Sequence, residues 1–223
     1  MSEALWADVD RYIVDRLLPA DPALEQALEA SRAAGLPDIQ VSPPQGKLLW
    51  LLAQAIGARA ILEIGTLGGY STIWLARALP TGGRLITLEA DERHAKTARA
   101  SLARAGLAGL AEVRVGRALD TLPGIAAEGR GPFDLIFIDA DKPSITEYFE
   151  WALRLSRKGS LILVDNVVRK GAVLDATTED PNVRGVRRFF ERLAAEPRVG
   201  ATALQTVGGK GYDGLAIAVV TAS

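Results

Sequence analysis

Two carboxylates and one amide follow the ends of two apolar runs in this sequence. Asp139 ends the run FDLIFID at 133–139, and Asp165 and Asn166 end the run LILVDN at 161–166. Parallel α/β sheets place their chemistry at the carboxyl ends of strands, so these side chains are expected to converge. Their oxygens suit a hard divalent cation, with Mg²⁺ first and Ca²⁺ or Mn²⁺ as alternatives. A helix cap or turn explains either Asp alone equally well, but the trio behind a nucleotide-type loop favours the metal.

A second candidate site is the glycine-rich segment EIGTLGGYS at 63–71. Glycines let the backbone turn sharply and approach a ligand closely. The spacing G-x-x-G-G differs from the G-x-G-x-x-G of dinucleotide-binding loops, and this disfavours an NAD-type dehydrogenase. Alone the loop is weak support for a ligand, because many strand–helix turns carry glycine for steric reasons.

Two acidic residues narrow the ligand of this loop. Glu63 lies in an otherwise apolar strand, where an unpaired charge is costly, and it can accept from a cationic amino group. Glu89 ends the next strand, where a carboxylate either binds ribose hydroxyls or is simply solvated. A carboxylate beside the loop disfavours a pyrophosphate. A ligand with a ribose and a positive centre, such as S-adenosylmethionine, fits better.

The elements that must position these residues are helices in the first part of the chain, followed by strands that alternate with helices. Residues 1–57 are expected to form a helical extension of the same domain, with a helix over 3–18, one starting at Asp21-Pro22 and one starting at Ser42-Pro43. Short β-type runs then alternate with helical stretches. The expected strands are 61–65, 84–89, 111–115, 133–139 and 160–165, and the expected helices lie near 70–79, 91–105, 118–128 and 143–156. This alternation predicts a doubly wound α/β fold with a mostly parallel sheet.

The C-terminal part breaks this alternation. A helix near 181–196 is followed by two β-type runs, at 199–207 and 214–220. The link GGKGYD between them is turn-rich and short, which predicts an antiparallel hairpin at the edge of the sheet. We expect one domain over residues 1–223.

Composition limits the classes of partner. The net charge is −1 over 223 residues, so nothing suggests a nucleic-acid partner. There is no cysteine and only one histidine, so any metal must be held mainly by oxygen. No apolar run approaches about 18 residues, and no signal peptide is evident, so the expectation is a cytoplasmic protein without a membrane partner.

Three motifs together carry a family resemblance. They are LEIGTLGGYS at 62–71, FDLIFIDADK at 133–142 and LILVDN at 161–166. In this order and spacing, the chain resembles the small cation-dependent O-methyltransferases, the caffeoyl-CoA and catechol O-methyltransferase group with its bacterial relatives. The resemblance begins at VSPPQG, 41–46, and covers nearly the whole chain. It implies the class I, Rossmann-like methyltransferase fold with seven strands, and S-adenosylmethionine as methyl donor.

The resemblance also implies roles for individual residues. The donor-binding positions are Val41, Glu63, Gly65, Thr66, Ser71, Glu89, Ala118 and Asp141. Asp139, Asp165 and Asn166 match the metal ligands. Lys142 falls at the place of a proposed general base, with Asp139 as a further option; a solvent-facing Lys142 is the alternative.

The reaction implied is methyl transfer to one hydroxyl of a small aromatic with two adjacent hydroxyls, of catechol, caffeate or flavonoid type. A cation that binds both hydroxyls lowers their pKa and fixes the reacting oxygen. An acyl-CoA ester acceptor is an alternative, although no long basic arrangement is evident, and so is a non-catalytic S-adenosylmethionine-binding protein. Arg169 and Lys170 either meet an anionic acceptor or form a basic pair on a flexible loop. His94 is expected at the surface, and the relatives suggest a homodimer.

Overall fold

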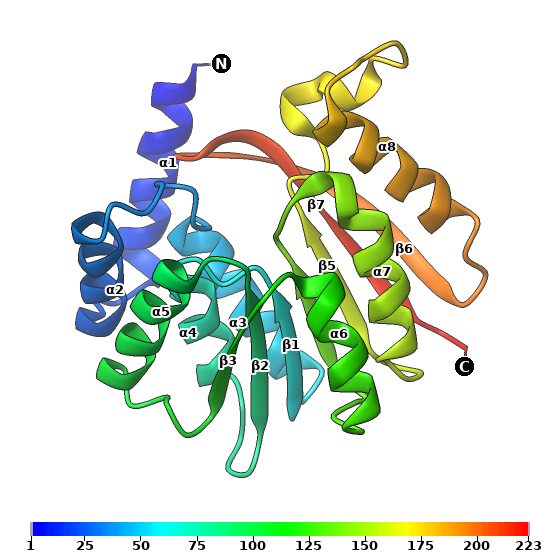
Figure 1. Ribbon diagram of the computed structural model, residues 1–223. Helices are drawn as coiled ribbons and strands as arrows, with labels where there is room; N and C mark the ends of the chain where they lie inside the picture. The colour runs from blue at the N-terminus through cyan, green and yellow to red at the C-terminus, as the bar shows by residue number, and fades with distance from the viewer. Residues whose placement is uncertain (1, 223) are drawn as a thin grey trace.

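The computed structural model describes residues 2–222. Within them, one seven-stranded sheet has the order β3-β2-β1-β4-β5-β7-β6 (Figure 1). The strands are β1 (Ala60–Ile64), β2 (Arg84–Glu89), β3 (Ala111–Val115), β4 (Leu135–Ile138), β5 (Leu161–Asp165), β6 (Val199–Gly208) and β7 (Gly211–Val220). The α-helices are α1 (Glu3–Leu17), α2 (Pro22–Ala33), α3 (Pro43–Ala55), α4 (Tyr70–Arg77), α5 (Glu92–Arg104), α6 (Ala118–Ala127), α7 (Ile145–Arg154) and α8 (Pro181–Ala194). The predicted doubly wound, mostly parallel fold is confirmed.

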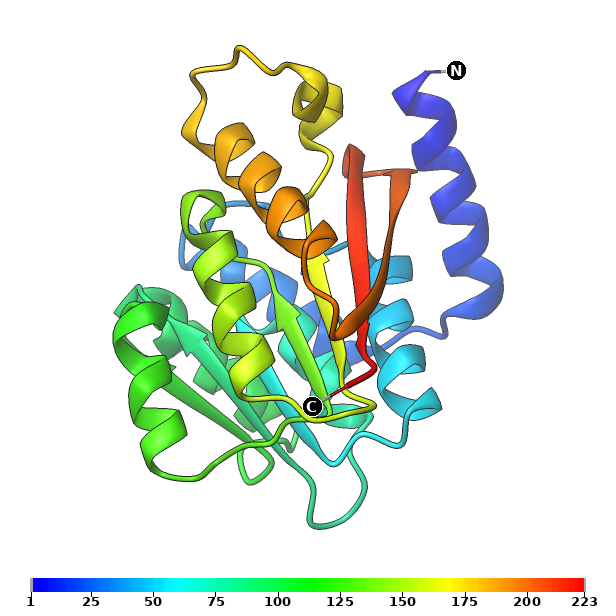
Figure 2. The same ribbon diagram turned by 90° about the vertical axis from the view of Figure 1, so that its right-hand side faces the viewer.

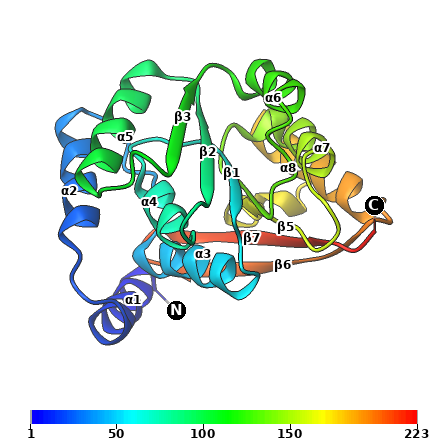
Figure 3. The same ribbon diagram turned by 90° about the horizontal axis from the view of Figure 1, so that it is seen from below.

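The C-terminal hairpin closes the sheet at one edge. Neighbouring strands from β1 to β5 are parallel, whereas β7 is antiparallel to both β5 and β6. Figure 3 shows β7 inserted between β5 and the edge strand β6. Gly208 pairs with Gly211, so the turn between the two strands consists only of Gly209 and Lys210. The link of six residues that the sequence predicted between these strands is therefore longer than the observed turn. Gly211, with φ of 93°, adopts the left-handed backbone that lets the pairing continue up to this tight turn.

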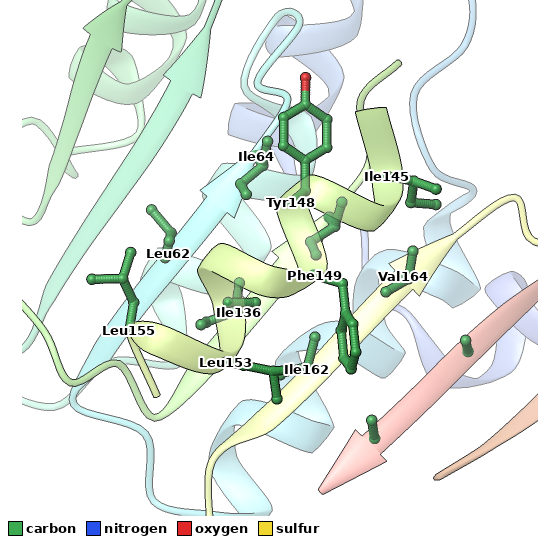
Figure 4. Close-up of a cluster of buried hydrophobic side chains, with 14 of the residues drawn as sticks. Leu62, Ile64, Ile136, Ile145, Tyr148, Phe149, Leu153, Leu155, Ile162 and Val164 are labelled. Atoms are coloured by element: carbon green, nitrogen blue, oxygen red, sulfur yellow. The ribbon is translucent and has the colours of Figure 1, made fainter. Parts of the chain in front are cut away.

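Both faces of the strands β1, β2, β4 and β5 are buried under helices. Successive strand residues point to opposite faces, so Ile61 packs with the side chains of α2–α5 and Leu62 packs with those of α6–α8. Figure 4 shows the second face, where Phe149 and Leu153 of α7 lie over the strand residue Ile162. The site therefore rests on strands that are held from both sides.

The N-terminal helices form as expected. Asp21 caps α2 through hydrogen bonds from the backbone N–H groups of Ala23 and Leu24, and Pro22 takes the first helical position. α1 lies beside the β6–β7 hairpin (Figure 2), where the N–H of Gly209 donates to Asp10 Oδ2 at 2.7 Å. The N-terminal region thus packs directly on the C-terminal hairpin.

The segment after β4 differs from the predicted boundaries. The strand predicted over 133–139 is shorter, and the helix predicted over 143–156 begins with the 3₁₀ turn η1 (Lys142–Ser144) before α7. Asp141 caps this turn by accepting from the N–H of Ser144 at 3.2 Å. The early turn directs the chain from the strand end back across the edge of the sheet.

None of the helices in residues 2–222 is long and apolar enough to cross a membrane. The longest of them, α1, has 15 residues, whereas a membrane span needs about 20 apolar ones. α1 also carries charged residues such as Asp8, Arg11 and Asp15 along its length.

Candidate active site

A cavity of about 640 Å³ lies at the carboxyl ends of β1, β2, β4 and β5. This is the edge where open α/β sheets bind their ligands, and the volume suits a small molecule. The predicted site residues that line it are Val41, Gly65, Thr66, Ser71, Glu89, Ala118, Asp139, Asp141, Lys142 and Asn166. The other two predicted residues, Glu63 and Asp165, are buried and contact residues at this edge. The structure therefore brings the predicted residues together.

Gly65 joins the glycine-rich loop at 63–71, the donor loop, to the predicted metal ligands. Its φ of 99° belongs to the left-handed region that favours glycine. A Cβ at this position would lie 2.0 Å from the backbone oxygen of Asp139. Only glycine therefore allows the end of β1 to approach the end of β4 so closely, which places the loop against Asp139.

Glu89 holds the donor loop in shape. Its Oε2 accepts from the N–H groups of Thr66 at 3.2 Å and Leu67 at 2.8 Å, and its Oε1 accepts from the N–H of Asp91 at 2.9 Å. Leu67 has a φ of 50°, an unfavourable backbone for leucine that these bonds help to maintain. Glu89 thus orders the loop and also lines the cavity.

Glu63 lies beneath the loop and is fully buried. Its carboxylate accepts from the hydroxyls of Ser71 at 2.6 Å, Thr72 at 2.5 Å and Thr87 at 2.7 Å. Burial raises the pKa of Glu63 to about 7, although the three hydroxyl bonds oppose the shift. Glu63 does not line the cavity, whereas Ser71, which donates to it, does.

Glu63→Gln is expected to remove a pH dependence of stability. The folded-state pKa of about 7 exceeds the ordinary 4.5, so the folded protein keeps a proton that the unfolded chain releases between these values. The contribution of Glu63 to stability is therefore fully present below pH 4.5 and is lost as the pH rises through about 7, by at most about 1.4 kcal/mol per unit. Urea unfolding of both proteins between pH 5 and 8 measures this. An equal pH dependence in the two proteins would show that Glu63 does not titrate in this range.

The predicted oxygen trio converges at the ends of β4 and β5. Ile138 of β4 pairs with Val164 of β5. The residues that follow them in the chain, Asp139 and Asp165, therefore lie at the same edge of the sheet. Asp165 is 5% exposed, and burial, together with the negative charge of Asp139, raises its pKa to about 7. The N–H of Asn166 donates to Asp165 Oδ1 at 2.8 Å.

This donor set fits a hard cation. Among residues 2–222, no three His, Cys, Asp or Glu side chains form a group that can hold a metal. The trio contains only two such side chains, because its third member is an amide. Asp165 lies buried beside the negative charge of Asp139, which a divalent cation would offset, and the carbonyl oxygen of Asn166 is a ligand of the same hard class.

Lys142 is a buried residue of the site. It is 6% exposed, and its Nζ lies 3.2 Å from Asp139 Oδ1. α8 packs on it so tightly that a Cβ on Gly185 would lie 2.1 Å from the backbone oxygen of Lys142. The alternative of a solvent-facing Lys142 is therefore wrong, because α8 covers the turn that carries it.

Two residues that line the cavity, His94 and Arg169, were not among the predicted donor, metal or catalytic residues. The expectation that His94 lies at the surface is wrong, because it lines the cavity with its Nδ1 3.6 Å from Glu89 Oε1. The available signal was its place in the first turn of α5, the helix that leaves the carboxyl end of β2. Arg169 also lines the cavity, whereas Lys170 is exposed.

A family model described as O-methyltransferase matches residues 18–218. A catechol O-methyltransferase from Niastella koreensis is 56% identical over 220 residues, which cover 99% of this chain and 100% of the relative. An O-methyltransferase from Bacillus cereus, solved in complex with SAH, has a TM-score of 0.98 at 60% identity and covers 99% of this chain and 100% of that one. TomG from Streptomyces achromogenes, solved with SAM, has a TM-score of 0.96 at 55% identity and covers 99% of each chain.

The matched region contains every element that builds the cavity. The family model reaches from the end of α1 into β7, and the relatives extend the match to almost the full length of the chain. The chain therefore belongs to the class I family of S-adenosylmethionine-dependent O-methyltransferases.

Proposed function

We propose that this chain is a divalent-cation-dependent O-methyltransferase acting on small aromatics with two adjacent hydroxyls, of catechol, caffeate or flavonoid type. The observation that carries the proposal is the contact of Gly65 with Asp139, which puts the donor loop against the oxygen trio. The name of the Niastella koreensis relative, a catechol O-methyltransferase, supports the same class of acceptor. Mg²⁺ is the first choice of cation, and Ca²⁺ and Mn²⁺ fit the same ligands.

The residues divide into a donor side and an acceptor side. On the donor side, Ser71 and Glu89 offer oxygen atoms to the methionine part and to the ribose of S-adenosylmethionine. Asp141 lines the same cavity and is held by the hydroxyl of Tyr148. Val41, Thr66 and Ala118 complete the walls. These residues bind and orient the donor.

On the acceptor side, Asp139, Asp165 and Asn166 would hold the cation. When bound, the cation lowers the pKa of two adjacent hydroxyls, and the donor supplies a methyl group for in-line transfer. Lys142, with its Nζ beside Asp139, is placed to take the proton from the reacting hydroxyl once it is itself deprotonated. Asp139 is a second candidate for this base. Coverage by α8 keeps bulk water away from Lys142.

Replacing Lys142 by methionine tests its role as base. We expect the kcat for catechol to fall about 10²- to 10⁴-fold, the range of general-base catalysis, while the Kd of the donor is unchanged. Steady-state kinetics and calorimetry measure the two quantities. Lys170→Met is the matched control because that lysine is exposed, and it is expected to keep wild-type activity. Retention of more than a tenth of the wild-type kcat in Lys142→Met would assign the base elsewhere.

A panel of acceptors tests the function as a whole. Purified protein with S-adenosylmethionine and Mg²⁺ is offered catechol, caffeate, a flavonoid diol, a caffeoyl-CoA ester and matched monophenols, with mass detection of the methyl gain. We expect products from the free diols and none from the monophenols. Turnover of the CoA ester alone would favour the acyl-CoA alternative, and donor binding without any product would favour a non-catalytic binding protein.

We also propose a homodimer in the cytoplasm. α1 exposes apolar side chains, with Leu5 46%, Val9 48% and Tyr12 63% exposed, and the neighbouring strand β6 exposes Leu204. A second copy of the chain that covers this face would bury them. Light scattering coupled to size exclusion measures the mass in solution, and a monomer at micromolar concentration would contradict the dimer.

A further inference from the structure

Gln45, near the start of α3, makes a contact that its local sequence does not predict. Ser42-Pro-Pro-Gln45 has the S-x-x-Q pattern of a capping box, in which the glutamine side chain returns to the N–H of the cap residue. Half of the box is present, because Ser42 Oγ accepts from the N–H of Gln45 at 3.3 Å. The side chain of Gln45, however, donates from Nε2 to Asp165 Oδ2 at 2.7 Å. A residue that usually closes a helix end thus contacts the end of β5.

This contact completes the fixing of Asp165. The N–H of Asn166 donates to Oδ1 at 2.8 Å, and Gln45 donates to Oδ2. Donors on both oxygens prevent rotation of the carboxylate about its Cβ–Cγ bond. Each carboxylate oxygen has two lone-pair sites, so each keeps one free for a further partner. Because Asp165 is only 5% exposed, water is poorly placed to replace a lost donor.

Among the hydrogen bonds of residues 2–222, the bond to Asp165 is the one that the Gln45 side chain makes. Gln45 also lines a second cavity, of about 210 Å³, together with Leu48 of α3 and Leu215 of β7. Because Gln45 borders this open space, the hydrogen bond to Asp165, more than close packing, determines where the amide lies. The two side chains therefore depend on each other for their orientation.

We propose that Gln45 is a positioning residue that aims the Asp165 carboxylate at the cation, and that the helical N-terminal region thereby takes part in the reaction centre. This inference rests on the proposed cation-dependent function. Partners of metal-binding carboxylates outside the ligand set typically change metal affinity or activity by about 10- to 100-fold. Gln45 acts on cation affinity and on acceptor turnover through Asp165, and it has no contact with the donor loop among the hydrogen bonds of residues 2–222.

The test compares two glutamines of the same helix. Gln45→Met keeps an unbranched side chain of similar length and removes the donor. Gln54→Met is the matched control, because Gln54 Nε2 donates to the backbone oxygen of Ala78 at 2.6 Å, away from the cavity. Calorimetry with Mn²⁺ measures cation affinity without turnover, calorimetry with S-adenosylmethionine measures donor affinity, and thermal unfolding measures stability.

We expect Gln45→Met to bind Mn²⁺ about 10- to 100-fold more weakly than wild type, with the donor Kd changed less than about twofold. Gln54→Met is expected to leave both affinities at the wild-type value. Gln45→Asn, which keeps the amide but shortens its reach, is expected to lose the same Mn²⁺ affinity and decides the question if the methionine variant does not fold.

Equal Mn²⁺ affinity in wild type and the Gln45 variants would overturn the role of Gln45 and leave the proposed function standing. An equal loss of Mn²⁺ and donor affinity, with a large fall in unfolding temperature, would show a merely structural role and would also overturn it. Absence of Mn²⁺ binding by the wild-type protein would overturn the proposed function together with this inference.

Discussion

Replacing Asp165 and Asn166 together by alanine is expected to lower turnover of catechol by about a thousandfold or more and to leave donor affinity nearly unchanged. The two side chains supply two of the three oxygen ligands proposed for the cation. Loss of the cation removes several kcal/mol of transition-state stabilisation, and about 1.4 kcal/mol corresponds to a factor of ten in rate. The donor affinity is expected to persist because Glu89 ends β2, the glycine loop follows β1, and Ser71 lies in the first turn of α4.

Steady-state kinetics and donor calorimetry on the double variant test this expectation. Asp175→Ala is the matched control, since Asp175 is an exposed carboxylate in the same connection between β5 and α8. That variant is expected to keep its activity within about twofold, as surface substitutions usually do. Near-wild-type turnover in the double variant would refute the role of the trio, and an equal loss of donor binding would make these residues part of the donor site.

Gly65→Ala is expected to damage stability and donor binding together. The alanine Cβ would meet the backbone oxygen of Asp139 at 2.0 Å, and the φ of 99° is strained for any residue with a Cβ. Strain and overpacking each cost about 1–3 kcal/mol, so we expect a total loss of about 2–6 kcal/mol in the free energy of unfolding. Any folded fraction would hold the loop and the proposed metal ligands apart, so donor affinity is expected to fall at least tenfold.

Urea unfolding and donor calorimetry measure these two effects. Gly109→Ala is the control, because a Cβ there meets nothing within 4 Å. It is expected to change stability by less than about 0.5 kcal/mol. If Gly65→Ala keeps wild-type stability and donor affinity, the close approach of β1 and β4 is not needed for the site.

Much of the fold was predictable because apolar periodicity and strand–helix alternation are local signals. The runs that end in Asp139 and Asp165 are central strands buried on both faces, and such strands read as continuous apolar segments. The insertion of β7 between β5 and β6 was not predictable in this way. Strand order depends on contacts between distant segments, and the turn at Gly209-Lys210 is shorter than its glycine-rich surroundings suggest.

The candidate site was predictable where a residue type is costly at its position. Glu63, a charge in an apolar strand, was expected to be paired, and three hydroxyls surround it. The position of His94 in the cavity was not predicted, because a polar helix predicts solvent exposure on average, whereas the first turn of α5 borders the cavity. The burial of Lys142 comes from packing by Gly185 of α8, which no local pattern reveals. Tertiary contacts decided these last two positions.

Methyl transfer from S-adenosylmethionine to catechol, before and after exhaustive removal of divalent cations with EDTA, tests the central claim most directly. We predict that turnover falls to background in the stripped protein and returns on addition of Mg²⁺, while donor affinity stays the same throughout. The loss follows because Asp139, Asp165 and Asn166 alone neither acidify a diol nor hold it beside the donor loop. Full activity after rigorous cation removal would contradict the claim.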